Sequence, residues 1–596
     1  MCGIAGRLSR KESTINHSVV LEICNKMIHR GPDFGDVRSF GPIALGHRRL
    51  SIIDLSTHAN QPMTLAKGRY SIVFNGEIYN YQEIRSDLIK LGYSFHTNSD
   101  TEVILNSFQE WGTNCLARFN GMFAFAIWDE KEQSLFLARD RFGKKPLFYS
   151  FGNHTFTFAS ETRAILEDHS ISNKISLEGV NCYLALGYIL NPMTMYESIK
   201  LLEPGSYMLL SRECKIIKKD FFWDYSDSFR NKISISEDDI AENILELLSK
   251  SVKRRMISDV PVGAFLSGGV DSSSIVSLMK KYHVGDLHTF SVGFEQKSHN
   301  ELPDADRVGQ WAGTIHHGII VDANRNNNLL EESIWASDQL FSDNSIIPMI
   351  EVSKLASKKV TVVLSGDGAD ELFGGYITYS ADNYYKKAQL IPRTIRKILS
   401  SERLKFNPFS LNKINFDYKR QQFFQGSLFD YQKAHYSWRL IFNEEERIKI
   451  LGTSAREIVY DTDPFKRFKS YYDKALDLFP LDQHLYVDAM TWLTDDILVK
   501  VDRSTMHSSI EARAPYLDID LVNFAASIPS EIKMKNGIKK YILKKALKNT
   551  VPEYVLKKKK SGFNAPVGSW IQNIEENEFK SFNKYVYEKR IPKQTR

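Results

Sequence analysis

Cysteine is scarce in this sequence, and its few occurrences are irregularly spaced. Among 596 residues the only cysteines are Cys2, Cys24, Cys115, Cys182 and Cys214. None belongs to a CxxC pair or to a His/Cys cluster of the kind that binds zinc. We therefore expect neither a disulfide framework nor a structural zinc site, and a reducing cytoplasm fits this usage. We interpret the last four cysteines as structural.

Long apolar runs and a strong charge excess are also missing. No window of 18 apolar residues occurs, and no charged start precedes an apolar core as in a secretory signal. Lys plus Arg number 78 against 72 Asp plus Glu, an excess too small to indicate a nucleic-acid-binding protein. We interpret basic runs such as Arg393 to Lys397 and Lys557 to Lys560 as solvated faces. The prediction is a cytoplasmic protein without a membrane span that acts on small molecules, and a homodimer stays open.

The spacing pattern of the apolar residues changes once along the chain. In residues 1–212 short apolar runs alternate with turn residues, which predicts stacked antiparallel sheets flanked by helices. Residues 213–238 are charged and polar and form the expected linker. In residues 239–596 strands alternate with helices, which predicts a parallel α/β sheet with a helical extension from about residue 380. The fold class is therefore a two-domain protein, α+β followed by α/β.

The stretch VGAFLSGGVDSSSIVSLMKK carries the strongest chemical signal. A buried strand runs to Leu266, and a turn beginning at Ser267 leads into an amphipathic helix. Gly268 and Gly269 let backbone N–H groups approach an anion, and the helix N-terminus adds its positive end. No lysine follows, so this is not the GxxxxGK[ST] phosphate loop. An ordinary glycine-rich turn is the alternative.

A second loop, LSGDGADELFGGY, resembles a partner for the first. It follows a buried strand that ends at Leu364 and carries three acidic residues within five positions. In parallel α/β sheets ligands bind beyond the carboxyl ends of the strands, where both loops would lie. Asp271 and Asp370 could then hold Mg²⁺, a cation that prefers carboxylate oxygens. A solvated acidic turn is the alternative.

The chain begins MCGIAG, which places a thiol directly after the initiator methionine. Removal of Met1 would leave the thiol and a free α-amine on Cys2. An α-amine has a pKa near ~8, so its neutral form can accept the thiol proton. The ordinary interpretation is a small buried hydrophobic residue.

Taken together, these segments resemble the asparagine synthetase family over nearly the whole chain. SGGVDSS (267–273) is similar to the PP-loop of N-type ATP pyrophosphatases. LSGDGADELFGGY, DDILVKVDRSTMHSSIEARAPYLD (495–518) and SGFNAPVGSW (561–570) are similar to the synthetase domain. The beginning of the chain resembles a class II, N-terminal-nucleophile glutamine amidotransferase in the segments Cys2-Gly3-Ile4, RGPD (30–33), RLSIID (49–54), NGEIYNY (75–81), NSDTE (98–102) and SETRAIL (160–166).

The resemblance implies a glutaminase in residues 1–212, in which Cys2 attacks the side-chain amide of glutamine. The implied oxyanion donors are the Asn75 side chain and the Gly76 N–H. The implied glutamine-binding residues are Arg49, Leu50, Ser51, Ile52, Ile53, Asn75, Gly76, Glu77 and Asp100. Arg49 would face the α-carboxylate and Asp100 the ammonium. From the residues alone, Asn75-Gly76 is typical of a hairpin turn, and Arg49 and Asp100 of surface charges.

In residues 239–596 the resemblance implies an ATP pyrophosphatase with Mg²⁺ on Asp271 and Asp370. The implied nucleotide-binding residues are Leu266, Ser267, Gly268, Gly269, Asp271, Ser272, Val292, Ser365 and Gly366. Lys540 would face phosphate during adenylation. Asp367 would take part in forming the acyl-adenylate, although well-known asparagine synthetases carry Glu there.

The implied reaction is glutamine-dependent synthesis of asparagine with ATP. Ammonia would pass between the domains through a tunnel lined by apolar and small side chains. The shorter Asp367 leaves open another acid as acceptor, such as a sugar acid of a surface polysaccharide. A PP-loop enzyme acting on tRNA would be expected to show a concentrated basic face. A non-catalytic relative could lose Cys2 or the acidic loop residues, which this chain keeps.

Overall fold

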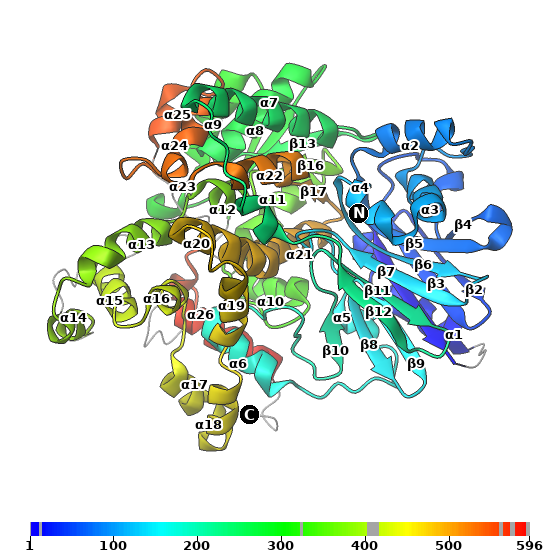
Figure 1. The fold of residues 1–596 in the computed structure, drawn as a ribbon, viewed down its shortest axis with the longest axis horizontal. Coiled ribbons are helices and arrows are strands. Elements are labelled where there is room, and N and C mark those ends of the chain that lie inside the picture. The colour runs from blue at the N-terminus through cyan, green and yellow to red at the C-terminus, as the bar shows by residue number, and fades with distance from the viewer. Residues whose placement is uncertain are drawn as a thin grey trace.

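The computed structural model describes residues 2–10, 15–321, 326–401, 404, 416–558, 564–571 and 578–591. Met1 and residues 559–563, which include the start of SGFNAPVGSW and part of the second basic run, lie outside these ranges. The amino-terminal third of the chain forms one side of the molecule, and the rest forms the other side (Figure 1). In the described part, no helix combines the length and apolar composition needed to cross a membrane.

Two antiparallel sheets pack face to face in the amino-terminal part. In the described residues the first sheet has the order β10 (Ile199–Leu201), β8 (Phe148–Gly152), β9 (Thr155–Ala159), β1 (Gly3–Ser9), β3 (Ile43–Arg49) and β2 (Phe34–Phe40). The second has the order β12 (Ile216–Phe221), β11 (Ser206–Ser211), β7 (Ser134–Arg139), β6 (Gly121–Asp129), β5 (Tyr70–Ile78) and β4 (Met63–Leu65). The predicted antiparallel β-sandwich is confirmed.

Strand β6 shows why this sandwich needs helices on its outer face. All of its residues after Gly121 are buried, so both faces of the strand are covered. Because side chains alternate along a strand, Phe123 and Phe125 join one apolar cluster and Ala124 and Trp128 another. The first cluster includes residues of the helices α2 (Tyr81–Lys90) and α3 (Asp100–Trp111), and the second includes residues of the opposing sheet.

The remainder of the chain is built on one parallel sheet. Its order in the described residues is β15 (Ile315–Val321), β14 (His288–Phe294), β13 (Val262–Phe265), β16 (Val362–Leu364) and β17 (Glu511–Arg513). The chain leaves β13 toward β14 and later enters β16 on the other side of β13. A reversal of strand order of this kind marks the usual ligand crevice of an open α/β sheet. The loops after β13 and β16, singled out in the sequence, begin at this point, and the predicted parallel fold is confirmed.

Helices surround this sheet and extend away from it. The other helices of the amino-terminal part are α1 (Ile15–Asn25), α4 (Cys115–Arg118), α5 (Thr162–Ile165) and α6 (Leu177–Leu186). Those near the parallel sheet include α7 (Glu237–Arg255), α8 (Val270–Tyr282), α9 (Leu302–Ala312), α10 (Asn326–Ser337), α11 (Ile346–Ala356), α12 (Ala369–Phe373), α21 (Leu498–Met506), α22 (Ile519–Ser527), α23 (Ser530–Lys533), α24 (Tyr541–Ala546) and α25 (Glu553–Lys557).

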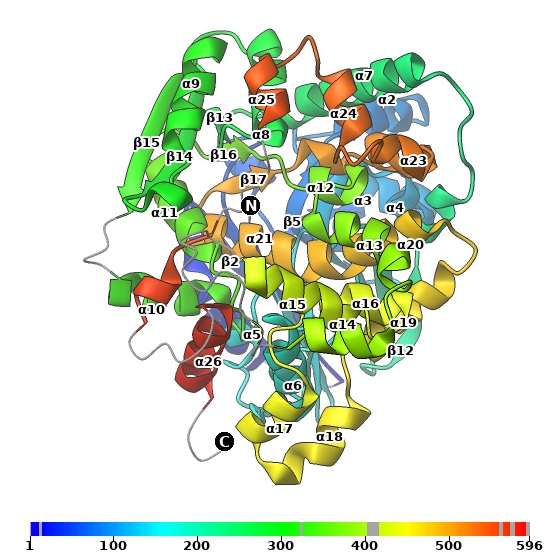
Figure 2. The same cartoon turned by 90° about the vertical axis from the view of Figure 1, so that its left-hand side faces the viewer.

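The helical extension lies beside the sheet domain and below it in Figure 2. It comprises α13 (Ile377–Ala388), α14 (Arg393–Leu399), α15 (Phe416–Gly426), α16 (Tyr431–Ser437), α17 (Glu444–Leu451), α18 (Arg456–Asp461), α19 (Phe465–Lys474) and α20 (Pro480–Asp488). A π-helical segment, Ala489–Ile497, joins α20 to α21, and α26 (Glu578–Arg590) ends the described chain.

Part of the predicted linker is regular structure. Strand β12 lies within residues 213–238 and pairs with β11, so it belongs to the amino-terminal sandwich. Helix α7 begins at Glu237, where the Ser236 side chain accepts a hydrogen bond from the Asp239 N–H. We therefore propose that the first domain continues to Phe221 and that the connection between the domains is shorter than predicted.

Buried ionic contacts join the two parts. The Arg30 guanidinium donates two hydrogen bonds to Asp502, of 2.9 and 3.1 Å, and neither side chain is more than 5% exposed. The Asn120 side-chain amide donates to both carboxylate oxygens of Asp518 at 3.1 Å. A buried carboxylate is costly unless it is paired, so these contacts fix how the domains meet.

Replacing Asp502 should destabilise the whole protein. Asp502→Ala leaves the Arg30 guanidinium buried without its main partner, a loss that costs about 3 kcal/mol or more. We expect a clear fall in the melting temperature by calorimetry. The control is Asp87→Ala, which removes an exposed pair with Lys90 (3.1 Å) and should cost less than about 1 kcal/mol. Equal melting temperatures for the two variants would contradict this account of the junction.

Candidate active sites

Cys2 lies immediately before β1, in the centre of the first sheet, and is 8% exposed. Its backbone nitrogen donates a hydrogen bond to Asn75 Oδ1 at 3.0 Å, and its Sγ lies 4.0 Å from the carbonyl oxygen of Leu50. Burial raises the pKa of the Cys2 thiol. The resting group is therefore the neutral thiol, and a nucleophilic attack requires a nearby base.

Asn75 and Gly76 lie inside strand β5, so their interpretation as a hairpin turn is wrong. They pair with Ala124 and Phe123 of β6. Gly76 has φ of +152°, and an added Cβ would lie 2.0 Å from the Met122 carbonyl oxygen, so only glycine fits. The Asn75 Nδ2 group is buried and has no hydrogen-bond partner among the described residues. A free amide donor thus lies beside Cys2, as an oxyanion site requires.

Glu77 and Asp100 form a buried acidic pair, so the interpretation of Asp100 as a surface charge is wrong. Each is 5% exposed, and Asp100 Oδ2 accepts a hydrogen bond from the Ile78 N–H at 3.0 Å. Burial raises the pKa of Asp100 to about 6. Burial and the nearby Glu511 carboxylate also raise the pKa of Glu77. The Arg513 guanidinium lies 3.3 Å from Glu77 Oε1 and partly offsets this charge.

Arg49 is buried as well, at 6% exposure, so its interpretation as a surface charge is also wrong. Its guanidinium donates to the carbonyl oxygen of Ser56 at 2.9 Å and to Asn60 Oδ1 at 2.7 Å. It also donates to the carbonyl oxygens of Ile53 and Asp54. Arg49 therefore holds the loop that follows β3, and its contact with a glutamine carboxylate stays a prediction.

That loop contains the other predicted glutamine-binding residues and is fixed at both ends. The Ser51 N–H donates to Asp33 Oδ2 at 2.7 Å, and the Ile52 carbonyl oxygen accepts from the Asp259 N–H at 2.9 Å. Leu50 and Ile52 are buried. The Asp259 contact comes from the second domain, so both domains position this loop.

The two predicted nucleotide loops meet at the carboxyl ends of β13 and β16. A Cβ on Gly366 would lie 2.9 Å from the Asp271 Cβ and 3.0 Å from the Ser272 nitrogen, so the loops are in close contact. Gly268 has φ of +68°. The Ser267 N–H donates to Ser272 Oγ at 3.1 Å, which shapes the first loop. Leu266, the residue after β13, and Val292, within β14, are both buried.

Lys540 joins the acidic residues of both loops. Its Nζ lies 2.7 Å from each Asp271 carboxylate oxygen and 2.6 Å from Asp370 Oδ1. Lys540 is the residue immediately before α24, and it is only 4% exposed. Two carboxylates, each from the first turn of the helix that follows its loop (α8 and α12), thus converge on one cationic group. Such convergence fits the binding of a divalent cation with substrate phosphates.

Asp367 lies on the same loop and is tied to Ser365. The Ser365 hydroxyl donates to Asp367 Oδ2 at 2.6 Å, and the Ser365 N–H donates to the Arg513 carbonyl oxygen at 2.9 Å. The sequence-predicted residues therefore fall into two groups, one around Cys2 and one around Lys540.

Comparisons with known proteins agree with this division. The asparagine synthase family model matches residues 243–585, and the glutamine amidotransferase domain model matches residues 1–223. The chain belongs to the asparagine synthetase family.

Individual relatives cover most of the chain. Asparagine synthetase [glutamine-hydrolyzing] 1 of Bacillus subtilis is 35% identical over 96% of this chain and 88% of that protein. A putative asparagine synthetase 2 of Methanocaldococcus jannaschii is 34% identical over 85% of this chain and 98% of that protein. Amidase chry2 of Gibberella zeae is 28% identical over 91% of this chain and 84% of that protein.

In this asparagine synthetase family member, sequence reasoning missed several charged residues near the second site. The Lys500 ammonium lies 3.0 Å from Asp343 Oδ2. Asp496 lies in the π-helical segment and is 1% exposed, and neither of its carboxylate oxygens has a hydrogen-bond partner among the described residues. Burial raises the pKa of Asp496. The available signal was charged residues that flank an apolar run, since DDILVK places Asp495, Asp496 and Lys500 around Ile497-Leu498-Val499.

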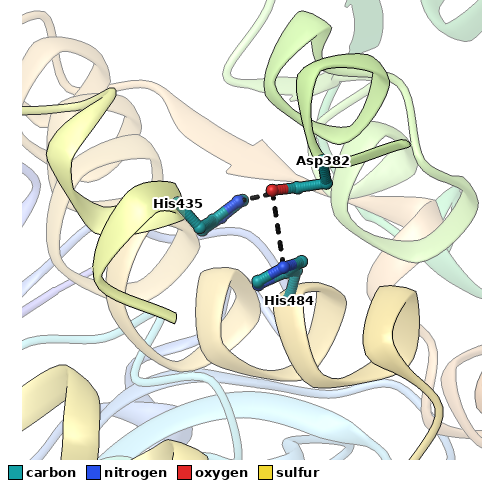
Figure 3. Close-up of side chains that lie close together, drawn as sticks. All are labelled: Asp382, His435 and His484. Carbon is teal, nitrogen blue, oxygen red and sulfur yellow. Dashed lines mark hydrogen bonds and ion pairs between the residues drawn. The ribbon is translucent and has the colours of Figure 1, made fainter. Parts of the chain in front are cut away.

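A histidine cluster in the helical extension is the other candidate site (Figure 3). His435 Nδ1 lies 2.9 Å from Asp382 Oδ2 and its Nε2 lies 3.1 Å from Asp488 Oδ1. His484 Nε2 lies 3.4 Å from Asp382 Oδ1, and its Nδ1 bonds the Tyr472 hydroxyl at 2.7 Å. These ligand types suit a transition metal.

The ring geometry argues against a metal ion in this cluster. The His435 and His484 rings stack 4.1 Å apart with an angle of 11° between their planes. Nitrogen lone pairs lie in the ring plane, so those of two stacked, parallel rings cannot converge on one ion. The two flanking carboxylates raise the pKa of His435 to about 9 despite burial, whereas burial lowers the pKa of His484. The His435 ring is therefore an imidazolium, balanced by the carboxylates of Asp382 and Asp488, and it stacks on the neutral imidazole of His484.

This cluster predicts a pH-dependent stability. Because the folded pKa of His435 is about 9 and an unfolded histidine has about 6.5, its contribution is complete below pH 6.5 and disappears as the pH rises through 9. The melting temperature of the wild type should fall over this window more than that of His435→Gln. A chelator should change neither curve. A chelator-sensitive melting temperature would instead indicate a metal site.

Proposed function

We propose that this protein is a glutamine-dependent asparagine synthetase. It converts ATP, L-aspartate, L-glutamine and water to AMP, diphosphate, L-asparagine and L-glutamate. The observation that carries this proposal is the presence of two buried sites in one chain: Cys2 beside the free amide of Asn75, and Lys540 between Asp271 and Asp370. The names of the bacterial and archaeal relatives support the same chemistry.

In the first site, the α-amine of Cys2 accepts the thiol proton after removal of Met1. The Cys2 sulfur then bonds to the side-chain carbonyl carbon of glutamine, the C–N bond breaks, and ammonia leaves with a proton. Asn75 Nδ2 and the Gly76 N–H donate to the oxyanion that forms. Water hydrolyses the thioester, which releases glutamate and restores the thiol. Glu77 and Asp100 bind the glutamine ammonium.

In the second site, a carboxylate oxygen of the acceptor bonds to the α-phosphorus of ATP and the bond to the β-phosphate oxygen breaks. The loops at Ser267–Ser272 and Ser365–Gly366 bind the nucleotide through backbone N–H groups. Mg²⁺ held by Asp271 and Asp370 would offset the charge of the departing diphosphate. Lys540 binds a phosphate oxygen. Ammonia then attacks the acyl carbon, and AMP leaves.

We propose aspartate as the acceptor because of the charges near Asp367. Lys500, which pairs with Asp343 and senses the charges of Asp367 and Asp496, offers a cation for a carboxylate. The buried Asp496, whose oxygens have no hydrogen-bond partner among the described residues, offers a carboxyl group that a ligand ammonium would ionise. An amino acid carries both groups, and a sugar acid lacks the ammonium. The second candidate is another carboxylate, which the short Asp367 side chain favours, and one relative is named an amidase.

Ammonia must cross from one domain to the other, and we propose that it travels inside the protein. A small cavity lies at the junction, lined by apolar residues such as Phe148, Ile189 and Leu340 and also by the charged residues Arg139, Lys144, Asp495, Asp502 and Arg503. A path of this kind would keep ammonia from being protonated in bulk water.

Product analysis of Cys2→Ala tests the division of labour. The variant loses the nucleophile, so glutamine-dependent synthesis should fall by at least ~10³-fold. Synthesis from ammonium chloride should be retained, with AMP and diphosphate as products. The assay quantifies AMP, diphosphate and amide with aspartate and with candidate sugar acids. Loss of both reactions in a folded variant, or ADP as the wild-type product, would refute the proposed function.

The use of glutamine should fall at low pH. The pKa of Asp100 is raised to about 6, so below that pH the carboxyl group is neutral and binds the glutamine ammonium weakly. We expect kcat/KM for glutamine hydrolysis to drop about tenfold per pH unit below pH 6, mainly through KM. A profile that stays flat down to pH 5 would contradict the assignment of Asp100.

A further inference from the structure

Strand β17 runs between the two sites, and its last residue contacts both. Arg513 pairs in register with Leu364 of β16. Its carbonyl oxygen accepts a hydrogen bond from the Ser365 N–H at 2.9 Å and lies 3.4 Å from the Ser365 hydroxyl oxygen. The same hydroxyl donates to Asp367 Oδ2 at 2.6 Å. The backbone of Arg513 thus supports the loop that faces the acceptor.

The side chain of Arg513 points the other way, toward the glutamine pocket. Its Nη2 lies 3.3 Å from Glu77 Oε1, and its Nε donates to Glu511 Oε1 at 2.6 Å. Its Nη1 donates to the carbonyl oxygens of Arg255 and Ile257, at 2.9 and 2.6 Å. The guanidinium is fully buried and is held in one orientation by contacts on three sides.

The charges around Glu77 explain why a guanidinium is needed there. Three carboxylates, those of Glu77, Asp100 and Glu511, influence one another electrostatically. The Arg513 guanidinium lowers the pKa of both Glu77 and Asp100, whereas Glu511 raises the pKa of both.

Other ionisable groups surround this set. Lys145 and the Arg513 guanidinium both lower the pKa of Glu511, and Arg255 lies over the ring of Tyr79, the residue that follows β5. The Arg513 guanidinium favours the ionised forms of Glu77 and Asp100, which suit a ligand ammonium, so its removal would raise the pKa of both carboxyl groups further.

We propose that Arg513 is a positioning residue shared by both reactions: its guanidinium contacts Glu77 and orients that carboxyl group to receive the glutamine ammonium, and its carbonyl oxygen fixes Ser365 and, through it, Asp367. This inference rests on the proposed function. It means that the glutamine pocket is incomplete without a residue of the ATP-binding domain. It also means that one substitution alters both sites, although they are built from different parts of the chain.

The test compares Arg513→Gln with Arg513→Lys. Arg513→Gln removes the charge and should raise KM for glutamine about tenfold. It should also move the acidic limb of the pH profile of kcat/KM for glutamine hydrolysis upward by about one pH unit. Arg513→Lys restores a positive charge but not the planar guanidinium with its several N–H donors. The acidic limb should therefore return to the wild-type position while KM stays elevated. In ammonia-driven synthesis, Arg513→Gln should lower kcat severalfold because β17 loses its side-chain anchor.

Two controls separate positioning from general damage. Arg255→Gln removes another fully buried arginine of the same junction, which pairs with Asp518 at 2.6 Å, and it should lower the melting temperature without moving the acidic limb. Glu77→Gln should impair only the glutamine reaction.

The inference is overturned if Arg513→Gln folds and leaves KM and the acidic limb for glutamine unchanged, or if Arg255→Gln shifts the limb equally. It is also overturned if ammonia-driven synthesis by Arg513→Gln matches the wild type. Failure of the proposed function would look different, because the wild type itself would then form no amide and AMP. Glutamine hydrolysis, which needs only the first site, would still report the pH shift.

Discussion

The buried pairing of Arg30 with Asp502 is the contact on which the arrangement of the two sites depends. Arg30 also donates to the carbonyl oxygen of Cys2 at 3.3 Å, so the guanidinium that docks the second domain also holds the backbone of the proposed nucleophile. Two charges removed from water stabilise a fold only in one geometry, because each needs the other's hydrogen bonds. The junction therefore sets the position of Cys2 and the register of the domains together.

Ionic contacts of this kind have a functional consequence that apolar packing would not have. A hydrophobic junction tolerates small sliding, whereas paired charges at fixed distances do not. Carboxylates of the second domain accept hydrogen bonds from the first at Asp338, Asp495 and Asp518 as well as at Asp502. A reactive intermediate that moves between two sites needs such a rigid body, since any opening would admit water.

Much of the fold could be predicted from the sequence, because strand periodicity and turn residues are local signals. The GMFAFAIW run shows this, since its two apolar faces are readable as a doubly covered strand. The Asn75-Gly76 turn was the wrong prediction, because the same dipeptide serves inside β5, where only glycine clears the Met122 carbonyl. Arg49 and Asp100 were predicted as site residues by resemblance, but their burial depends on contacts far along the chain.

The residues that sequence reasoning missed share one property. All four, Arg513, Glu511, Lys500 and Asp496, are buried charged residues of the second domain. Arg513 contacts Glu77 and Lys500 contacts Asp343, and both of these contacts join residues far apart in the sequence. Charge in an apolar stretch signals a buried pair, but it does not identify the partner. The family resemblance located these segments without assigning a role to their individual side chains.

We propose that ammonia passes inside the protein from the site around Cys2 to the site around Lys540 without release to the solvent. An isotope competition tests this most directly: the enzyme receives glutamine labelled with ¹⁵N in the amide, ATP, the acceptor and an excess of unlabelled ammonium chloride. The account predicts that nearly all of the product amide carries ¹⁵N. A product amide whose ¹⁵N fraction equals that of the total ammonia in solution would contradict it.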